Sequence, residues 1–304
     1  MKIFFVIPVL LLFVLAIGCK DSSSGPAESS HDSTLLTFVI NAKGVHDPRQ
    51  GEKYVLWLRF AQDSVWQPMK QLTIRSTSAE DTATLVGSFE GPQPVDSITG
   101  ILVCFQPANT DATLQFPLLE AHDLIYNTGT KSLFATLDHA IHIGDYSALA
   151  GSLVFTSTST DTLAYIHEYY LMNLSGTAQS PSLSSLKVPP EGWMYGLWAT
   201  DSSFTPHQNF FYGLFSNPSG HDSDSLRDFY PYPGGWKPQA MNVPSGNIIV
   251  TLEPLCYGDS LKYKGPSPFT LLEFKRIRYI DKDRNYPMTN VSSDGLPSGW
   301  ISFR

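Results

Sequence analysis

Short apolar segments recur along the whole chain and predict β-strands. They are rich in β-branched and aromatic residues, and turn-forming residues separate them, with 22 glycines and 22 prolines in 304 residues. Strands are expected at 36–40, 54–60, 70–74, 84–89, 98–105, 114–119, 152–156, 165–172, 193–199, 210–215, 247–252, 269–277 and 299–303, and less clearly at 122–126 and 132–137. A parallel α/β fold would need intervening helices of about 10–15 residues, and the sequence shows none. The fold class is therefore predicted to be all-β.

One strand pattern occurs twice, because the Tyr-x-Leu-Trp order at 54–57 returns at 195–198. Further matches keep the same order along the chain, and the offset only grows, from 132 to 153 positions. A duplicated domain with longer loops in its second copy produces that behaviour. The matched pairs are 38–44 with 170–176, Trp57 with Trp198, Gln106-Pro107 with Glu253-Pro254, and Phe116 with Phe269.

The duplication predicts two tandem domains, at 33–146 and 147–280, with 281–304 as a last strand or a tail. Each copy has enough strands for a seven-stranded immunoglobulin-like β-sandwich. The strand at 54–60 is apolar on both faces, which is typical of a central strand. The repeated tryptophan in this strand is therefore expected in the core and not at a ligand platform.

The amino terminus predicts export and a lipid anchor. Lys2 precedes an apolar run from Ile3 to Ile17, which has the length of a secretory signal and is too short for a bilayer span of about 20 residues. The sequence Ala-Ile-Gly-Cys ending at Cys19 resembles the lipobox of bacterial lipoproteins, in which the cysteine carries the lipid. We expect a signal peptide at 1–18, a lipidated Cys19 and a flexible Ser-rich tether to residue 32, with the outer membrane as the destination. The alternative is an ordinary signal peptide with a cysteine by chance.

The net charge limits which partners are expected, and the cysteine content limits which disulfides are expected. The formal net charge is −8, and nucleic acid or anionic headgroups need a basic patch, so nucleic acid is not expected as a partner. The densest basic stretch, 275–278, is expected to be a solvated strand face. Cys104 and Cys256 could form one disulfide, but they occupy different positions in the two copies, so each is predicted to be a buried thiol.

The order Gly-x-x-Tyr-x-Leu-Trp, followed by a strand that ends in Gln-Pro or Glu-Pro, resembles the extracytoplasmic domain of membrane anti-sigma factors of the anti-sigma-K type. The similarity covers 38–119 and 170–274. It implies an immunoglobulin-like fold and an envelope location. Anti-sigma activity in that family belongs to a separate cytoplasmic domain without a counterpart in this sequence, so no sigma-factor binding and no functional residue is implied.

The search for catalytic and metal-binding motifs predicts no enzyme and no cofactor. The Gly-x-Ser-x-Gly nucleophile motif and the phosphate-binding glycine loop are absent from the sequence. Three histidines, His122, His139 and His142, could bind a zinc ion. However, His139 and His142 are three residues apart, and in a strand this spacing points the two side chains to opposite faces. Glu253 and Asp259 are a possible carboxylate pair, with nothing to indicate acid catalysis. A calcium ion at the acidic loop around residue 222 is the alternative to a solvated loop, and no metal is predicted.

The stretch from Trp193 to Trp236 is unusually aromatic, with 12 aromatic residues among its 44. Exposed aromatic faces stack on sugars or clamp peptides. The candidate ligand-binding residues are Phe229, Tyr230, Tyr232 and Trp236 with the acidic neighbours Asp222 and Asp224. A lid over the second domain is the alternative role. The sequence thus favours a lipid-anchored envelope protein that acts as a non-catalytic binding or interaction module, with a glycan-binding lipoprotein and a structural or regulatory part of an envelope complex as alternatives.

Overall fold

The computed structural model describes residues 34–45, 48, 51–77, 82–107, 116–157, 166–176, 178–201, 208–217, 241–242, 246–255, 265–275 and 283–304. The chain divides into two units, Met1–Asp32 and Ser33–Arg304. The first unit lies outside the described residues, so the signal peptide, the anchor and the tether stay predictions. The all-β prediction is confirmed, because the described residues contain twenty strands and only two helical turns. None of the described helices has the length and apolar character needed to cross a membrane.

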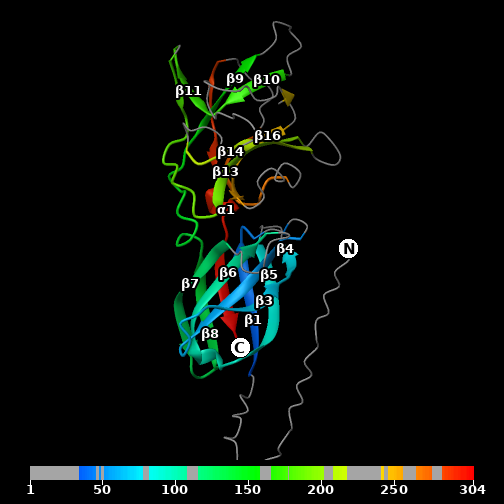
Figure 1. The fold of residues 1–304 in the computed structure, drawn as a ribbon, viewed down its shortest axis with the longest axis vertical. Helices are drawn as coiled ribbons and strands as arrows, with labels where there is room; N and C mark the ends of the chain where they lie inside the picture. Colours follow the sequence, from blue (N-terminus) through cyan, green and yellow to red (C-terminus); the bar gives the residue numbers. More distant parts are fainter. Residues whose placement is uncertain are drawn as a thin grey trace, which may run out of the picture. The chain divides into compact units, whose positions relative to one another are not determined.

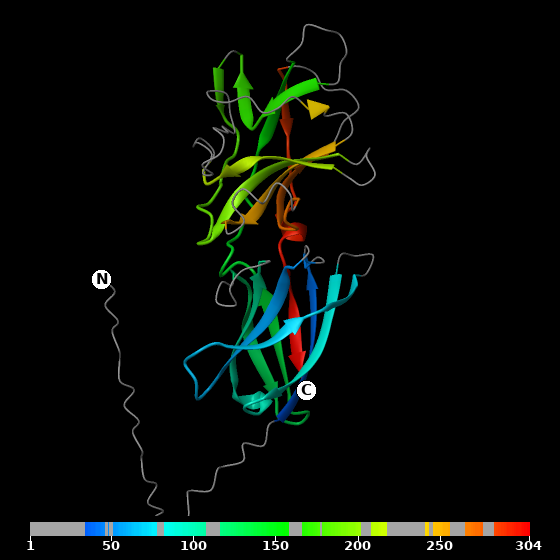
Figure 2. The same cartoon turned by 45° about the vertical axis from the view of Figure 1, so that its right-hand side comes forward.

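A nine-stranded antiparallel sheet contains most of the first half of the chain (Figures 1 and 2). Its strand order is β3-β2-β6-β7-β8-β20-β1-β5-β4, and a 3-10 turn at Val95–Ser97 precedes β6. The strands are β1 (Thr34–Lys43), β2 (Lys53–Phe60), β3 (Gln67–Leu72), β4 (Ile74–Thr77), β5 (Thr82–Gly91), β6 (Ile98–Gln106), β7 (Phe116–Asn127), β8 (Ser132–Asp138) and β20 (Ser298–Phe303). The two strands at opposite edges, β3 and β4, are separated in sequence by one residue, so the sheet curls until its edges meet.

The C-terminal strand completes this sheet. β20 lies between β8 and β1 and forms six residue pairs with each of them, so it is a central strand. Figures 1 and 2 both show it, in red, beside the blue β1. Its inward residues Ile301 and Phe303 are fully buried. The segment 281–304, predicted as a last strand or a tail, thus ends in a strand whose partners are more than 150 residues away in the sequence, and it also contains the short strands β18 (Asn285–Pro287) and β19 (Thr289–Asn290), which pair with β9 (Ser152–Ser157) and β17 (Thr270–Phe274). The proposed boundary at residues 146 and 147 stays a prediction.

Three further sheets contain the rest of the described chain. The four-stranded sheet has the order β15-β10-β9-β18, the two-stranded sheet pairs β11 with β12, and the five-stranded sheet has the order β14-β13-β16-β17-β19. The bounds are β9 (Ser152–Ser157), β10 (Ile166–Tyr170), β11 (Met172–Ser175), β12 (Ala178–Pro181), β13 (Trp193–Asp201), β14 (Gln208–Phe215), β15 (Met241–Asn242), β16 (Gly246–Pro254), β17 (Thr270–Phe274), β18 (Asn285–Pro287) and β19 (Thr289–Asn290), with a helical turn α1 (Ser292–Gly295) before β20.

The two strands that contain the Tyr-x-Leu-Trp order have equivalent neighbours. β2 lies between β3 and β6, with β7 beyond, and β13 lies between β14 and β16, with β17 beyond. The register also agrees. Trp57 pairs with Leu102, and Trp198 pairs with Ile249. Leu102 and Ile249 are 147 positions apart in the sequence, which is also the separation of the Gln-Pro and Glu-Pro steps. The two four-stranded arrangements are thus equivalent in order and in register.

The buried strand residues form one large core and a small second cluster of Met194, Trp198, Leu214 and Ile249. The inward residues of β2, namely Tyr54, Leu56 and Leu58, are fully buried, as the pattern predicts. Trp193 packs against Phe105 and Phe116 of the nine-stranded sheet, with ring centroids 6.2 and 5.3 Å apart. The contact with Phe116 has an edge-to-face geometry, and such a contact adds to the stabilisation from the buried area of the rings. The tryptophans of the two Tyr-x-Leu-Trp segments differ in exposure, since Trp198 is fully buried and Trp57 is half-buried.

Candidate binding site

The residues proposed from the sequence as a ligand site lie outside the described residues. The structure therefore neither brings them together nor separates them, and their roles stay predictions. They are Asp222, Asp224, Phe229, Tyr230, Tyr232 and Trp236, and the same holds for the lipid-anchor residue Cys19.

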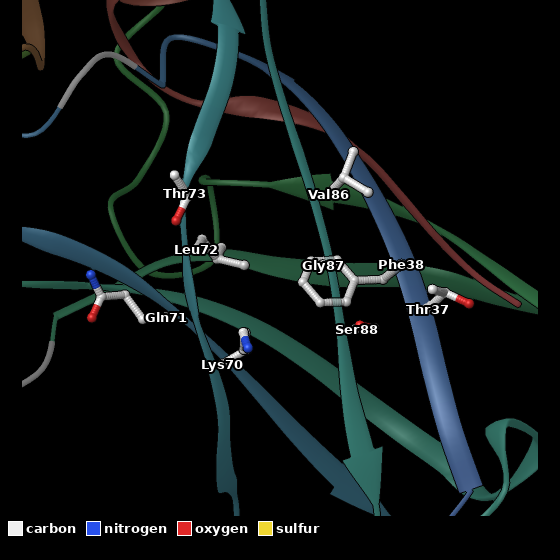
Figure 3. Close-up of a pocket in the computed structure, with 9 residues that line it drawn as sticks. All are labelled: Thr37, Phe38, Lys70, Gln71, Leu72, Thr73, Val86, Gly87 and Ser88. Carbon is white, nitrogen blue, oxygen red and sulfur yellow. The ribbon is translucent and has the colours of Figure 1, made fainter.

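The strand formed by β3 and β4 changes its partner at Thr73. Up to Leu72 it pairs with β2, and from Ile74 it pairs with β5. β4 pairs only with residues 83–85, whereas β5 continues to Gly91. Beyond Thr73, β3 and the second half of β5 diverge and leave a hollow between them (Figure 3). This opening between β3 and residues 86–91 of β5 is named the seam.

The hollow at the seam has the size of a small binding pocket. Its volume is about 370 Å³, near the lower end of the range of about 300–1,000 Å³ that is typical of ligand sites. Residues of β1, β3 and β5 surround it (Figure 3). The lining residues are Thr37, Phe38, Lys70, Gln71, Leu72, Thr73, Val86, Gly87 and Ser88.

The floor of the hollow is apolar because β5 has a glycine at its centre. Gly87 pairs with Phe38 of β1, and a Cβ atom at Gly87 would lie 2.6 Å from Cζ of the Phe38 ring. The ring thus occupies the inward space that a side chain at position 87 would need. Leu72 closes the other side of the floor, and both Phe38 and Leu72 are more than nine-tenths buried.

Lys70 places a positive charge at the hollow. It pairs with Leu56, whose side chain is in the core, so position 70 belongs to the inward face of β3. Lys70 is nevertheless exposed, because the sheet is open there. A lysine that points inward on an edge strand opposes pairing with an uncharged strand. Anything that enters the seam must therefore either avoid this ammonium group or neutralise it.

A second exposed surface lies on the outer face of the nine-stranded sheet. Phe134 of β8 and Trp300 of β20 are 42% and 36% exposed, with ring centroids 5.8 Å apart. Ile125 of β7 pairs with Phe134 and is 61% exposed. These three side chains form an apolar patch, but single exposed apolar residues are common on soluble surfaces.

Glu253, considered above as one of a carboxylate pair, is a structural residue. It is fully buried, and its Oε1 accepts hydrogen bonds from Trp198 Nε1 at 2.9 Å, Thr251 Oγ1 at 2.6 Å and the Ser267 amide at 2.8 Å. Three donors on one oxygen stabilise a buried carboxylate and tie the loop before β17 to β13 and β16. Asp259 lies outside the described residues, so the pair itself is not tested.

The histidines are arranged around β7 and β8 without a metal-binding geometry. His142 Nε2 lies 2.8 Å from Glu120 Oε2, while His139 Nδ1 lies 2.9 Å from the carbonyl oxygen of Pro297. His122 belongs to β7. Within the described ranges, no group of three histidine, cysteine, aspartate or glutamate side chains is placed to hold a metal ion. His139 instead links the end of β8 to the segment that leads into β20.

The buried thiol and phenols belong to the core. Cys104 is free and buried, and burial raises its pKa to about 12. The hydroxyls of Tyr146 and Tyr195 lie 3.0 Å apart, and Tyr195 donates a hydrogen bond to the carbonyl oxygen of Lys187. Burial raises the pKa of both phenols, so they stay protonated and act as hydrogen-bonding groups.

Sequence reasoning did not find the seam. The strand pattern correctly placed an element at 84–89, and a glycine inside a strand is a known sign of a close approach by another group. Gly87 was therefore a usable signal. The change of partner at Thr73 had no comparable local sign, because it depends on which strands are available at each edge of the curled sheet.

No family model matches this chain, and neither a curated protein nor a solved structure matches it.

Proposed function

We propose that the protein is a lipid-anchored cell-envelope protein, held at the outer membrane through Cys19, and that it acts as a non-catalytic binding module. The seam is the observation that carries the proposal. It combines an apolar floor, two strand edges and one lysine in a hollow of about 370 Å³. The strands that line the hollow, β1, β3 and β5, are packed on the large hydrophobic core, so the walls of the hollow are pre-organised for binding.

We also propose that the fold arose by duplication of an immunoglobulin-like domain. The shared order of β3-β2-β6-β7 and β14-β13-β16-β17 supports this origin. The equal register of Trp57 and Trp198 with their neighbours supports it further, since unrelated sheets rarely agree in both order and register. In this interpretation β20 is an addition that completes the first copy.

The experiment combines localisation with capture in the cell. The Cys19→Ser variant should move from the membrane fraction to the soluble fraction, because one thioether-linked lipid is the only proposed attachment. A photo-crosslinking residue at Ser88, in the hollow, should give a discrete adduct in intact cells, and the same residue at Lys131, in the exposed β7–β8 turn, should not.

Each result has a definite meaning. Retention of the Cys19→Ser variant in the membrane fraction contradicts the anchor. Equal adducts at Ser88 and Lys131, or none at either, contradict the seam as the binding site. Turnover of a polysaccharide or an ester by the purified protein contradicts the non-catalytic role. A glycan adduct that depends on Tyr232 and Trp236 instead supports the glycan-binding alternative.

A further inference from the structure

We propose that the seam binds an extended, acidic polypeptide segment of a partner protein, which adds as a strand to the free edge of β5 at residues 86–91. The inference rests on the proposed function and names the partner class for the same site. Strand addition is an established mode of peptide recognition, in which backbone hydrogen bonds supply affinity and pockets for alternate side chains supply specificity.

The first argument is the unfinished ladder on β5. β1 pairs with β5 along its whole length, but on the other side β4 pairs only with residues 83–85. Among the described residues, no strand pairs with β5 on that side from Val86 onward. Backbone groups of alternate residues therefore point into the seam, where a strand collinear with β4 would continue the ladder.

The second argument is that only one of the two edges suits an incoming strand. β3 contains Pro68, which pairs with Trp57 and has no backbone N–H to donate. Proline is a common feature of edge strands that do not accept a neighbour. β5 has no proline between Thr82 and Gly91. The free edge of β5 is therefore the acceptor, and β3 forms the opposite wall.

The third argument concerns side chains. Successive residues of a strand point to opposite faces, so every second side chain of the incoming segment would point toward the core. The side chain opposite Gly87 would meet no side chain from β5 and would contact the ring of Phe38 and the side chain of Leu72. An apolar residue of the partner fits this position.

The fourth argument is charge. Lys70 is exposed at the hollow, lies on the inward face of β3 and takes part in no ion pair with the described chain. An uncharged strand would bury this ammonium group without compensation, which is costly. A carboxylate on the incoming segment would instead form a charge-assisted hydrogen bond. Lys70 thus selects an acidic segment and excludes an uncharged edge from a second copy of this chain.

A sugar is a poorer fit to the same hollow. Sugar recognition uses the exposed face of an aromatic ring. Among the described residues that line the hollow, the one aromatic residue is Phe38, which is 2% exposed. The walls are backbone edges, and these match the hydrogen-bonding groups of a peptide. The protein's own tether, residues 20–32, is rich in serine and contains Pro26, so it has low strand propensity.

The test uses the mature lipidated chain in detergent and a synthetic probe, the acetylated peptide Thr-Val-Thr-Val-Thr-Glu-Thr with a fluorophore, in which the valines and the glutamate lie on one face of the strand. Binding is followed by fluorescence polarisation, and hydrogen exchange is followed by mass spectrometry. We expect slower exchange at residues 86–91 on binding, with no change in β13. Lys70→Glu should weaken binding about tenfold or more through charge repulsion, and the matched surface change Lys131→Glu should leave it unaltered.

Backbone methylation of the probe separates strand addition from other modes. Two probes, N-methylated at alternate residues in the two possible phases, keep every side chain. A strand that adds to one edge uses the N–H groups of alternate residues only, so one probe should lose binding and the other should keep it. Equal binding by both probes, or binding without protection of residues 86–91, overturns the inference.

The outcomes also distinguish this inference from the proposed function. A partner captured at Ser88 that leaves exchange at 86–91 unchanged retains the binding module and overturns strand addition. Tighter binding of the probe by Lys70→Thr than by the unaltered chain overturns the proposed attraction between Lys70 and a carboxylate of the partner. The lysine would then only oppose pairing at this edge. Cross-links from Ser88 to residues 20–32 or to a second copy of the chain overturn the choice of a partner protein.

Discussion

The position of β20 predicts that the last residues of the chain stabilise its first sheet. Ile301 lies in the middle of β20, pairs with Ile40 on one side and with Ala135 on the other, and is fully buried. Ile301→Ala removes buried methyl and methylene groups between two neighbouring strands. Substitutions of this kind cost about 2–5 kcal/mol in free energy of unfolding. A shift of about 2–4 °C per kcal/mol for a domain of this size corresponds to a melting temperature roughly 4–20 °C lower.

The assay is urea unfolding followed by circular dichroism, with hydrogen exchange to locate the effect. Exchange should increase in β1 and β8, the neighbours of β20. The matched control is Ser302→Ala, because Ser302 lies on the same strand but points outward, and surface changes usually alter stability by less than about 0.5 kcal/mol. Deletion of residues 298–304 should abolish protection of β1 and β8.

Two results would refute this reasoning. A destabilisation by Ile301→Ala no larger than that of Ser302→Ala would show that position 301 is not packed in the core. Unchanged exchange in β1 and β8 after deletion of 298–304 would show that these two strands do not depend on β20.

Three other perturbations test the core. Gly192 has φ of +81°, and a Cβ atom there would lie 2.3 Å from a ring carbon, so Gly192→Ala should lower stability by about 2–4 kcal/mol through strain and overpacking. Gly176→Ala is its control, with φ of +61° and no atom within 4 Å, and should cost only about 1–2 kcal/mol in a thermal melt. The pKa of Tyr195 and of Tyr146 is raised in the folded state, so the stability they contribute is present below their unfolded pKa of about 10 and is lost as pH rises above it. Tyr195→Phe should cost about 1 kcal/mol near neutral pH and make unfolding less dependent on alkaline pH, and an unchanged alkaline slope contradicts this. The pKa of Cys104 is raised to about 12, so a thiol reagent should label it at neutral pH only as fast as the chain unfolds, and rapid labelling of the folded chain would show that the thiol is accessible.

The strand content was predictable because it depends on a local property. Short apolar segments such as 54–60 predict strands, and the burial of Tyr54, Leu56 and Leu58 on one face and of Val55 on the other confirms that this strand is apolar on both faces. The offset of 147 positions between the Gln-Pro and Glu-Pro steps also separates Leu102 from Ile249, the residues that pair with Trp57 and Trp198. Local patterns thus contain real information about pairing wherever the paired strands are close in sequence.

The arrangement of the sheet edges was not predictable from the same patterns. Nothing in Ser298–Phe303 distinguishes a terminal strand from a central one, because its apolar residues show the same alternation in either place. The break at Thr73 was also missed, and a single strand was expected at 70–74. Both features depend on competition among strands for partners, which no single segment records.

The sequence by itself thus determined the fold class and the position of most strands, since these follow from short apolar segments that turn-forming residues separate. Only the tertiary structure decided that β20 enters between β8 and β1 and that β5 keeps a free edge above Phe38. Those outcomes depend on pairing between distant segments in a curled sheet of nine strands, whose edge strands β3 and β4 are joined through Thr73. The candidate site exists because that closure is incomplete.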